Sequence, residues 1–474
     1  MRANTRLACE IRSMAIRNYL LGGAVFAILY GCAAASGETM ESSLTQAYQT
    51  NPQLNAQRAS VRSTDEFVPQ ALSGYRPRVA VTASAGYQYG TENETAPGTP
   101  TAIFSGAQRP RSVGTSVTQT LFNGYQTANR TRAAEVQVSA AREGLRVLEQ
   151  NVLLTAATVY MDYLRDSAIL EVNRSNVRVL EQTLAQTRER YKVGDVTRTD
   201  VAQSGAQLAA GRTQLQTAES NLTTTRANFH RVIGSEPQNP LAASPVDRLL
   251  PKTLTDAIDL ALTENPNVTA SMFGIDVSFL QVKVNEGALF PTVTFQASVQ
   301  QSYEPALTID RQFNAAAIAQ VSVPIYQGGG EYSLIRQSKE TLAQQRLALQ
   351  QVRDQARSNV VSAWGQLLAG KSQVKSAQEQ VSESETALNG VRDEARVGQR
   401  TTLDVLNAQQ ALVNARVALV TAQHDRVVAS FGVLSAVGRL SPSVLGLHTV
   451  IYDPSVHYQQ VRDSWGGVRT PDGK

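Results

Sequence analysis

The sequence predicts a mostly helical α+β membrane protein, in which long antiparallel coiled-coil helices are joined to four β-strands per chain. Three observations carry this prediction. The chain repeats itself, its apolar residues recur every seven positions over two long stretches of each copy, and they alternate in a shorter stretch that follows a proline. Seven-residue spacing is typical of helices that pack as coiled coils, whereas alternation is typical of strands with one apolar face.

The duplication sets the expected domain organisation. A shift of 204 residues needs no gap to superimpose Gly124 on Gly328 and Asp200 on Asp404. An earlier match needs a shift of 214, so the ten-residue difference falls in one connection, where insertions cost little. We expect these segments: a signal peptide at 1–37, a first structural repeat at 38–234, a linker at 235–256, a second repeat at 257–438 and a C-terminal tail at 439–474.

The first 37 residues are typical of an export signal, because arginines precede an apolar run from Tyr19 to Ala35 and small residues follow. A membrane anchor is a second interpretation, since the run could just span a bilayer. Lipidation of Cys32 is a third, because Leu29 to Cys32 approximates a lipobox. Removal of residues 1–37 leaves a chain without cysteine, which suits an oxidising compartment.

Composition argues against several partners and activities. Residues 1–37 hold four arginines and one glutamate, so the rest of the chain is nearly neutral and no nucleic-acid partner is expected. The four histidines have no cysteine or carboxylate at metal-ligand spacing. Gly328 to Gly330 is not followed by Lys-Ser or Lys-Thr, which disfavours a phosphate-binding loop. We therefore expect no catalytic residue, no metal and no cofactor.

Each repeat is expected to begin with a helix that an Asn-Pro pair interrupts near its start and that a later proline ends. The period then changes from 3.6 to 2, which predicts a strand that starts after Pro77 or Pro291. The expected helices are 43–74 and 257–287, the polar connections are near 90–111 and 303–314, and the return strands are near 112–122 and 315–326. A soluble sheet would alternate in the same way, but strands of about 11 residues also suit a membrane.

A long helix is expected after Gly124 and after Gly328, running into the 190s and the 390s. At about 1.5 Å per residue, such a helix extends on the order of 100 Å, which no small globular protein accommodates. A Val-Gly turn then reverses the chain into a second helix with the same seven-residue spacing. Each repeat is therefore an antiparallel helical hairpin joined to a strand hairpin.

Four strands are too few to close a barrel, because roughly eight are needed. An open sheet in lipid would leave unpaired backbone groups, at several kcal/mol each. If the strands enter a membrane, the chain must therefore oligomerise. Three copies would supply twelve strands and twelve helices around one axis, with polar side chains lining a water-filled pore.

Two junctions of the chain resemble the TolC family of outer-membrane export channels. The similarity is strongest from Val323 to Gly329 and from Arg396 to Ala408, with weaker similarity around the first turn from Tyr191 to Val201, and it covers about residues 40 to 440. The resemblance implies a trimeric 12-stranded β-barrel in the outer membrane with a periplasmic α-helical tunnel. It implies the exit duct of a tripartite efflux or type I secretion system. The implied partners are outer-membrane lipid, two further copies of the chain, a periplasmic adaptor (membrane fusion) protein, and an inner-membrane pump or ABC transporter.

The resemblance also implies roles for residues at the helical turns. Arg400 would hold the tip closed through bonds to Thr199 and Asp200 on an adjacent hairpin, and Asp404 would form the pore constriction. Asn407 stands where members of the family carry a second Asp, which predicts a weaker charged ring. The expected adaptor-docking positions are Val193, Gly194, Val397, Gly398 and Gln399. Both aspartates also suit the start of a helix, where a carboxylate meets the helix dipole, and this role is compatible with the others.

The alternative is an exported structural coiled-coil surface protein, which explains the seven-residue spacing but not the strand hairpins. A simple porin is disfavoured by the long helices. The sequence leaves the cargo open between small molecules and polypeptide. The tail beyond residue 440 has no apolar period, and we expect it to be partly disordered.

Overall fold

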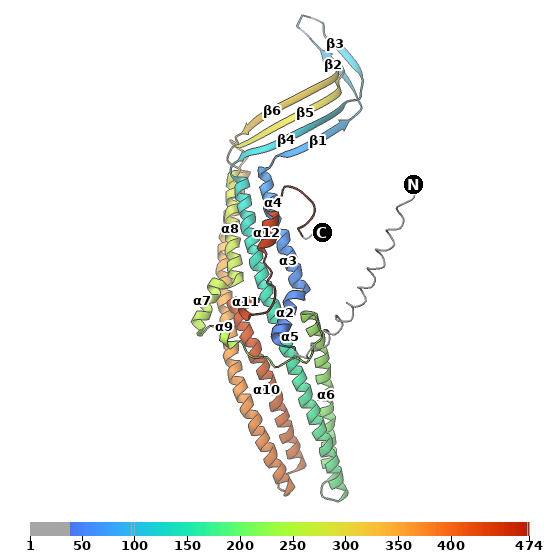
Figure 1. Cartoon of the computed structure of the whole chain (residues 1–474), viewed down its shortest axis with the longest axis vertical. Coiled ribbons are helices and arrows are strands. Elements are labelled where there is room, and N and C mark those ends of the chain that lie inside the picture. Colours follow the sequence, from blue (N-terminus) through green and yellow to red (C-terminus); the bar gives the residue numbers. More distant parts are fainter. Residues whose placement is uncertain (1–37, 96, 99, 472, 474) are drawn as a thin grey trace, which may run out of the picture.

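The computed structural model describes residues 38–471 and 473, except residues 96 and 99. The expected signal peptide, with Cys32, lies outside the described residues. The molecule is elongated, with a sheet at one end and helices that run from it to two tips at the other end (Figure 1). Across the described residues, every helix is too short or too polar to be a membrane span.

Each repeat starts with helices that an asparagine interrupts, as predicted. In the first repeat these are α2 (Met40–Thr50), α3 (Pro52–Asp65) and α4 (Phe67–Leu72). In the second they are α7 (Leu254–Glu264) and α8 (Pro266–Gly287).

The asparagine at each break joins two parts of its repeat. The Asn51 side chain accepts hydrogen bonds from the first turn of α3 and donates one to the carbonyl of Val232 (3.2 Å). Asn265 caps α8 in the same way and donates to the carbonyl of Ala436 (2.9 Å). Because the two acceptors are 204 residues apart, both repeats fasten the break to the end of their last long helix.

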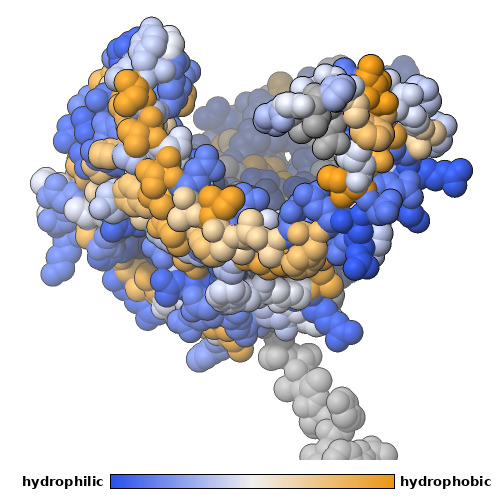
Figure 2. All heavy atoms as spheres, turned by 90° about the horizontal axis from the view of Figure 1, so that it is seen from above, coloured by the Kyte–Doolittle hydropathy of each residue, from blue (hydrophilic) through white to orange (hydrophobic). Residues whose placement is uncertain are grey.

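The main sheet has four antiparallel strands in the order β1-β4-β5-β6. The strands are β1 (Arg78–Ala85), β4 (Arg111–Asn123), β5 (Thr292–Ala306) and β6 (Ile309–Ser322). The two repeats meet where β4 pairs with β5, for example at Val117 opposite Ala297. Seen from the sheet end, hydrophobic residues gather in a band along one side of the molecule (Figure 2).

The connections between strands differ from the prediction. The stretch expected to be a connection at 90–111 contains most of an additional hairpin, β2 (Gln88–Glu94) with β3 (Ala102–Gln108). The stretch at 303–314 is largely strand, because β5 and β6 are separated by only residues 307–308. In both places strand pairing satisfies backbone groups that a polar loop would leave to water. Polar composition alone does not reveal such pairing.

The long helical hairpins are confirmed. They are formed by α5 (Gln126–Lys192) with α6 (Arg198–Ile233), and by α9 (Gly330–Arg396) with α10 (Thr402–Val437). Both α5 and α9 contain 67 residues, close to the predicted length. An ion pair links the helices of each hairpin at the same place in the repeat: Arg212 with Glu181 (2.7 Å) and Arg416 with Glu385 (2.6 Å).

The largest side chains of the core gather halfway along the molecule. Tyr48, Tyr160, Phe229 and Phe431 are almost fully buried in one cluster that draws on α2, α5, α6 and α10. The Tyr160 hydroxyl lies 2.7 Å from the carbonyl oxygen of Leu241. Burial raises the pKa of Tyr160 to about 12. The segment between the repeats, with its short helix η2 (Asp247–Leu249), is thus held against the middle of the helices.

The first part of the tail is folded onto the helices, whereas its residues 462–471 are exposed and lie outside any helix or strand, so partial disorder stays a prediction. The folded part contains α11 (Pro442–Leu445) and α12 (Ser455–Val461). The His457 ring pairs with the fully buried Asp65 at 3.0 Å. Such contacts come from single polar and aromatic side chains, so they leave no periodic signal in the sequence.

Candidate functional site

The first helical tip is a tight turn between α5 and α6. Val193 ends α5, and Gly194 follows with a φ of 79°. The amide of Gly194 donates to the carbonyl of Tyr191 (3.0 Å), and the amide of Asp195 donates to the carbonyl of Arg190 (3.0 Å). This pair of bonds closes a helix end through a left-handed residue, a conformation that favours glycine.

The second tip, between α9 and α10, repeats this geometry. Gly398 has a φ of 80°, and its amide donates to the carbonyl of Ala395 (3.3 Å). Gln399 donates to the carbonyl of Glu394 (2.9 Å). Both valines before the glycines are largely exposed, Val193 at 79% and Val397 at 71%. Both turns lie at the end of the molecule farthest from the sheet (Figure 1).

Asp200 and Asp404 each close the start of the helix that follows the turn. The amide and the hydroxyl of Thr401 donate to Asp404 Oδ2 at 3.0 and 2.9 Å, and the Asp404 amide donates back to Thr401 Oγ1. Thr197 and Asp200 form the same reciprocal arrangement. The hydrogen bonds from the Thr401 backbone and side chain lower the pKa of Asp404, and those from Thr197 lower the pKa of Asp200. Both carboxylates therefore stay charged at neutral pH while they complete the capping boxes that Thr197 and Thr401 begin.

Arg400 pairs with Glu394 across the second turn, with its Nε 2.8 Å from Glu394 Oε2. Both side chains are about half exposed. The first tip has a pair of reversed polarity, because Arg190 lies at the helix end and contacts Asp195 in the turn at 2.6 Å. Exposed pairs of this kind contribute little to stability, so each arginine can exchange its partner at low cost.

The expected latch residues are not brought together within one chain. Arg400 contacts Glu394, and the carboxylate of Asp200 accepts its hydrogen bonds from Thr197. The Thr199 side chain is exposed. Asn407 is exposed one turn after Asp404, so the two lie on neighbouring positions of one helix face. The roles of these residues in closure stay predictions, and they require a second hairpin beside Arg400.

Glu394, in the last turn of α9, and Asp195, in the turn after α5, were missed by the sequence reasoning, although each pairs with an arginine across its turn. A search for opposite charges on either side of each Val-Gly turn would have found them. The ion pairs between helices carried a clearer signal, because Glu181 and Arg212 recur as Glu385 and Arg416 under the 204-residue shift.

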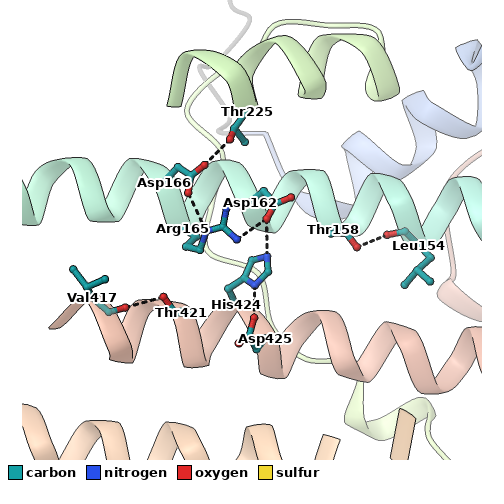
Figure 3. A network of polar contacts seen from close by, with 10 residues as sticks. All are labelled: Leu154, Thr158, Asp162, Arg165, Asp166, Thr225, Val417, Thr421, His424 and Asp425. Atoms are coloured by element: carbon teal, nitrogen blue, oxygen red, sulfur yellow. Dashed lines mark hydrogen bonds and ion pairs between the residues drawn. The ribbon is translucent and has the colours of Figure 1, made fainter. Parts of the chain in front are cut away.

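A buried polar network joins the two repeats farther up the helices. His424 of α10 lies between Asp162 of α5, with Nε2 to Oδ1 at 3.0 Å, and Asp425, with Nδ1 to Oδ1 at 2.8 Å. Figure 3 shows Arg165 reaching both Asp162 and Asp166, and Asp166 facing Thr225 of α6. The network has no copy, since the 204-residue shift places Gln366 at the position of Asp162 and Ser220 at that of His424.

In the described part of the chain, no group of three or more His, Cys, Asp or Glu side chains lies close enough together to hold a metal ion.

A duplicated chain of strand hairpins and very long helical hairpins, with tight turns at one end, defines a class of channel proteins. The family described as outer membrane efflux protein matches residues 43–235 and 257–439, and the chain belongs to this family. It is an outer-membrane protein with a periplasmic helical extension and not an enzyme. Membership of this family argues against the alternative interpretation, an exported coiled-coil surface protein.

Curated relatives span nearly the whole chain. The chain is 40% identical to the outer membrane efflux protein BepC of Brucella suis over 456 residues, which are 96% of each chain. It is 24% identical to the outer membrane protein TolC of Escherichia coli, over 88% of this chain and 87% of TolC. It is also 24% identical to the alkaline protease secretion protein AprF of Pseudomonas aeruginosa, over 66% of each.

Solved structures share the fold at low sequence identity. The CmeC outer membrane channel of Campylobacter jejuni is 16% identical, covers 90% of this chain and 89% of its own, and superimposes with a TM-score of 0.75. The outer membrane protein VceC of Vibrio cholerae is 18% identical, with a TM-score of 0.71 over 84% of this chain and 96% of its own.

Proposed function

We propose that three copies of this chain form the outer-membrane exit duct of a tripartite efflux or type I secretion system. The observation that carries the proposal is a four-stranded sheet with two open edges, continuous with helices of 67 residues that end in matched tips. A sheet in lipid needs partners for its edges, and helices of roughly 100 Å give the duct its periplasmic length.

The strand directions support closure by further copies. The strands alternate in direction across the sheet, so β6 of one copy beside β1 of the next continues the antiparallel order. Every side chain of β1 and of β6 is exposed in the single chain. Twelve strands from three copies exceed the roughly eight that fill their own interior, which leaves room for a water-filled passage.

The named relatives support a role in export but leave the cargo open. AprF is named for secretion of alkaline protease, OpmQ for export of pyoverdine, and BepC for efflux. A channel in the outer membrane has no energy source of its own. An inner-membrane pump or ABC transporter and a periplasmic adaptor are therefore the partners, with the adaptor at the exposed Val193-Gly194 and Val397-Gly398-Gln399 turns.

The tips carry the gate in this proposal. In the assembled duct Arg400 exchanges its exposed partner Glu394 for Thr199 and Asp200 of a neighbouring hairpin, and three such contacts hold the entrance shut. Arginine bound to a carboxylate in a partly water-excluded contact is worth more than the exposed pair it replaces. Asp404 and Asn407, one helical turn apart, then form the constriction.

Single-channel conductance in planar bilayers tests the gate. The variant R400A should conduct about tenfold more than the wild type, because three latches are lost at once. The matched variant E394A removes only the partner seen within the chain and should stay closed. Equal conductance of R400A and wild type would refute the latch, and an open E394A channel would assign closure to the Arg400–Glu394 pair instead.

A further inference from the structure

We propose that the end of the C-terminal tail is a lipid anchor, in which Trp465 and Val468 enter the periplasmic surface of the outer membrane beside the base of the sheet. The partner is a phospholipid bilayer surface, and the tail is a strap that ties the helical region to it. The inference depends on the outer-membrane location of the sheet and not on the proposed gate or cargo.

Three contacts lead the tail along the helices toward the sheet. His457 pairs with the buried Asp65 of α3 at 3.0 Å. The Arg142 guanidinium of α5 lies 5.1 Å from the ring centroid of Tyr458. Arg462 then contacts Glu135 of α5 at 3.3 Å. Successive tail residues therefore contact α5 positions progressively closer to its start, which is its sheet end (Figure 1).

Arg76 fixes the position of Trp465. Its guanidinium lies 4.7 Å from the centroid of the Trp465 ring, and its Nη1 donates to the carbonyl of Ser464. Arg76 stands two residues before β1, at the point where the helices give way to the sheet. The ring is thus placed where the membrane-spanning strands leave the bilayer.

The end of the docked segment nevertheless keeps the side chains of Trp465 and Val468 uncovered. Trp465 is 75% exposed although Arg76 already contacts it, and Val468, three residues further on, is fully exposed. Docking against the helices therefore does not bury these groups. Each would leave water on contact with lipid, which is favourable because apolar surface is removed from water.

Exposed aromatic residues mark the same level around the sheet. One flanks the periplasmic end of each strand of the four-stranded sheet: Tyr75 before β1, Tyr125 after β4, Phe290 before β5 and Tyr326 after β6. Tryptophan and tyrosine gather at membrane–water interfaces, because one part of the side chain is apolar and another is polar. Trp465 extends this set from a distant part of the sequence, and Arg76, Arg78 and Arg469 supply positive charge for lipid phosphates.

Fluorescence quenching can test the anchor in the full-length protein, because the chain has only two tryptophans, Trp364 and Trp465. The variant W364F leaves Trp465 as the single probe. It is reconstituted into phosphatidylethanolamine–phosphatidylglycerol vesicles that contain lipids brominated either near the headgroup or near the acyl-chain end. The matched control W465F keeps only Trp364, which lies on α9 in the helical region.

Trp465 should be quenched about twofold more than Trp364 by brominated lipid, and more by shallow than by deep bromines, as expected for an interfacial ring. Equal quenching of the two variants would overturn the proposal. Strong quenching of Trp465 by aqueous iodide without any effect of brominated lipid would also overturn it, and would place the ring in water. If neither quencher reduces the Trp465 fluorescence, the ring is covered by protein. That result would assign the segment to a protein partner and would also overturn the proposal. Because Trp364 is partly buried, W364Y serves as a second single-probe variant if W364F does not assemble.

Discussion

His424 of α10 and Asp162 of α5 form an ion pair of 3.0 Å that joins the second repeat to the first. Burial and the nearby charge of Arg165 would each lower the pKa of His424. Its contacts with Asp162 and Asp425 outweigh both effects, so the pKa is raised. Burial alone would raise the pKa of Asp162, but His424 and Arg165 outweigh it and lower it. The pair is therefore fully charged in mildly acidic solution.

The stability of the helical region should depend on pH through this pair. A raised histidine pKa gives stability that is complete below about pH 6.5, the usual histidine value, and is lost as pH rises through the raised pKa. The contribution of Asp162 is complete above the usual aspartate pKa and is lost as the pH falls through its lowered pKa. Thermal unfolding by circular dichroism between pH 5 and 9 should therefore show H424Q less stable at pH 6 and nearly equal to wild type at pH 9.

A matched variant sharpens this test. D425N removes the second carboxylate that raises the His424 pKa, so the pH-dependent loss should move to lower pH while the Asp162 contact stays. Unfolding temperatures of H424Q and wild type that run parallel across the whole pH range would show that the pair does not couple the repeats.

Two substitutions can separate the proposed role of the Asp404 charge at the constriction from its role at the start of α10. D404N keeps a side-chain oxygen that can accept from Thr401, whereas D404A loses both the charge and the reciprocal half of the capping box, with Thr401 still capping the helix. We expect D404N to reduce cation selectivity in planar bilayers several-fold without loss of stability, and D404A to lower the stability of the tip in addition. Unchanged selectivity in D404N would remove Asp404 from the constriction.

A bulky side chain in place of either turn glycine should prevent export. Nothing lies within 4 Å of a Cβ added to Gly194 or Gly398, but both residues have a positive φ that other residues adopt at a cost. G194L or G398L should abolish export in cells while trimers still form on gels. Gly390, which is also unobstructed but lies within α9, is the control position, and G390A should export normally. Normal export by G398L would show that the tip does not dock an adaptor.

Sequence reasoning predicted the features that depend on local patterns. The long helices followed from seven-residue spacing, and the breaks at Asn51 and Asn265 followed from the proline after each. The end of each long helix was placed at its Val-Gly pair, where the structure has a left-handed glycine. These features depend on only a few neighbouring residues, so one amino-acid sequence is enough to predict them.

The remaining features depend on residues far apart in the sequence. Arg76 meets Trp465, and Asp65 meets His457, across almost the whole chain, so no spacing or period links them. The β2–β3 hairpin was hidden because its polar residues are typical of loops. The contacts that dock the first part of the tail were not predicted, because they come from isolated polar and aromatic side chains that leave no period in the sequence.

Disulfide crosslinking between sheet edges tests the central claim, that several copies share one continuous wall. Within one chain β1 and β6 lie three strand spacings apart, about 14 Å, which is beyond the reach of a disulfide. A cysteine at Val81 of β1, combined in turn with cysteines at Ala315, Ala317 and Ala319 of β6, should yield covalent trimers on non-reducing gels for at least one pair. The neighbouring positions Val117 and Ala297 serve as the control and should crosslink within one chain. If every β1–β6 pair stays monomeric while this control forms its bond, the sheets do not join and the duct does not exist.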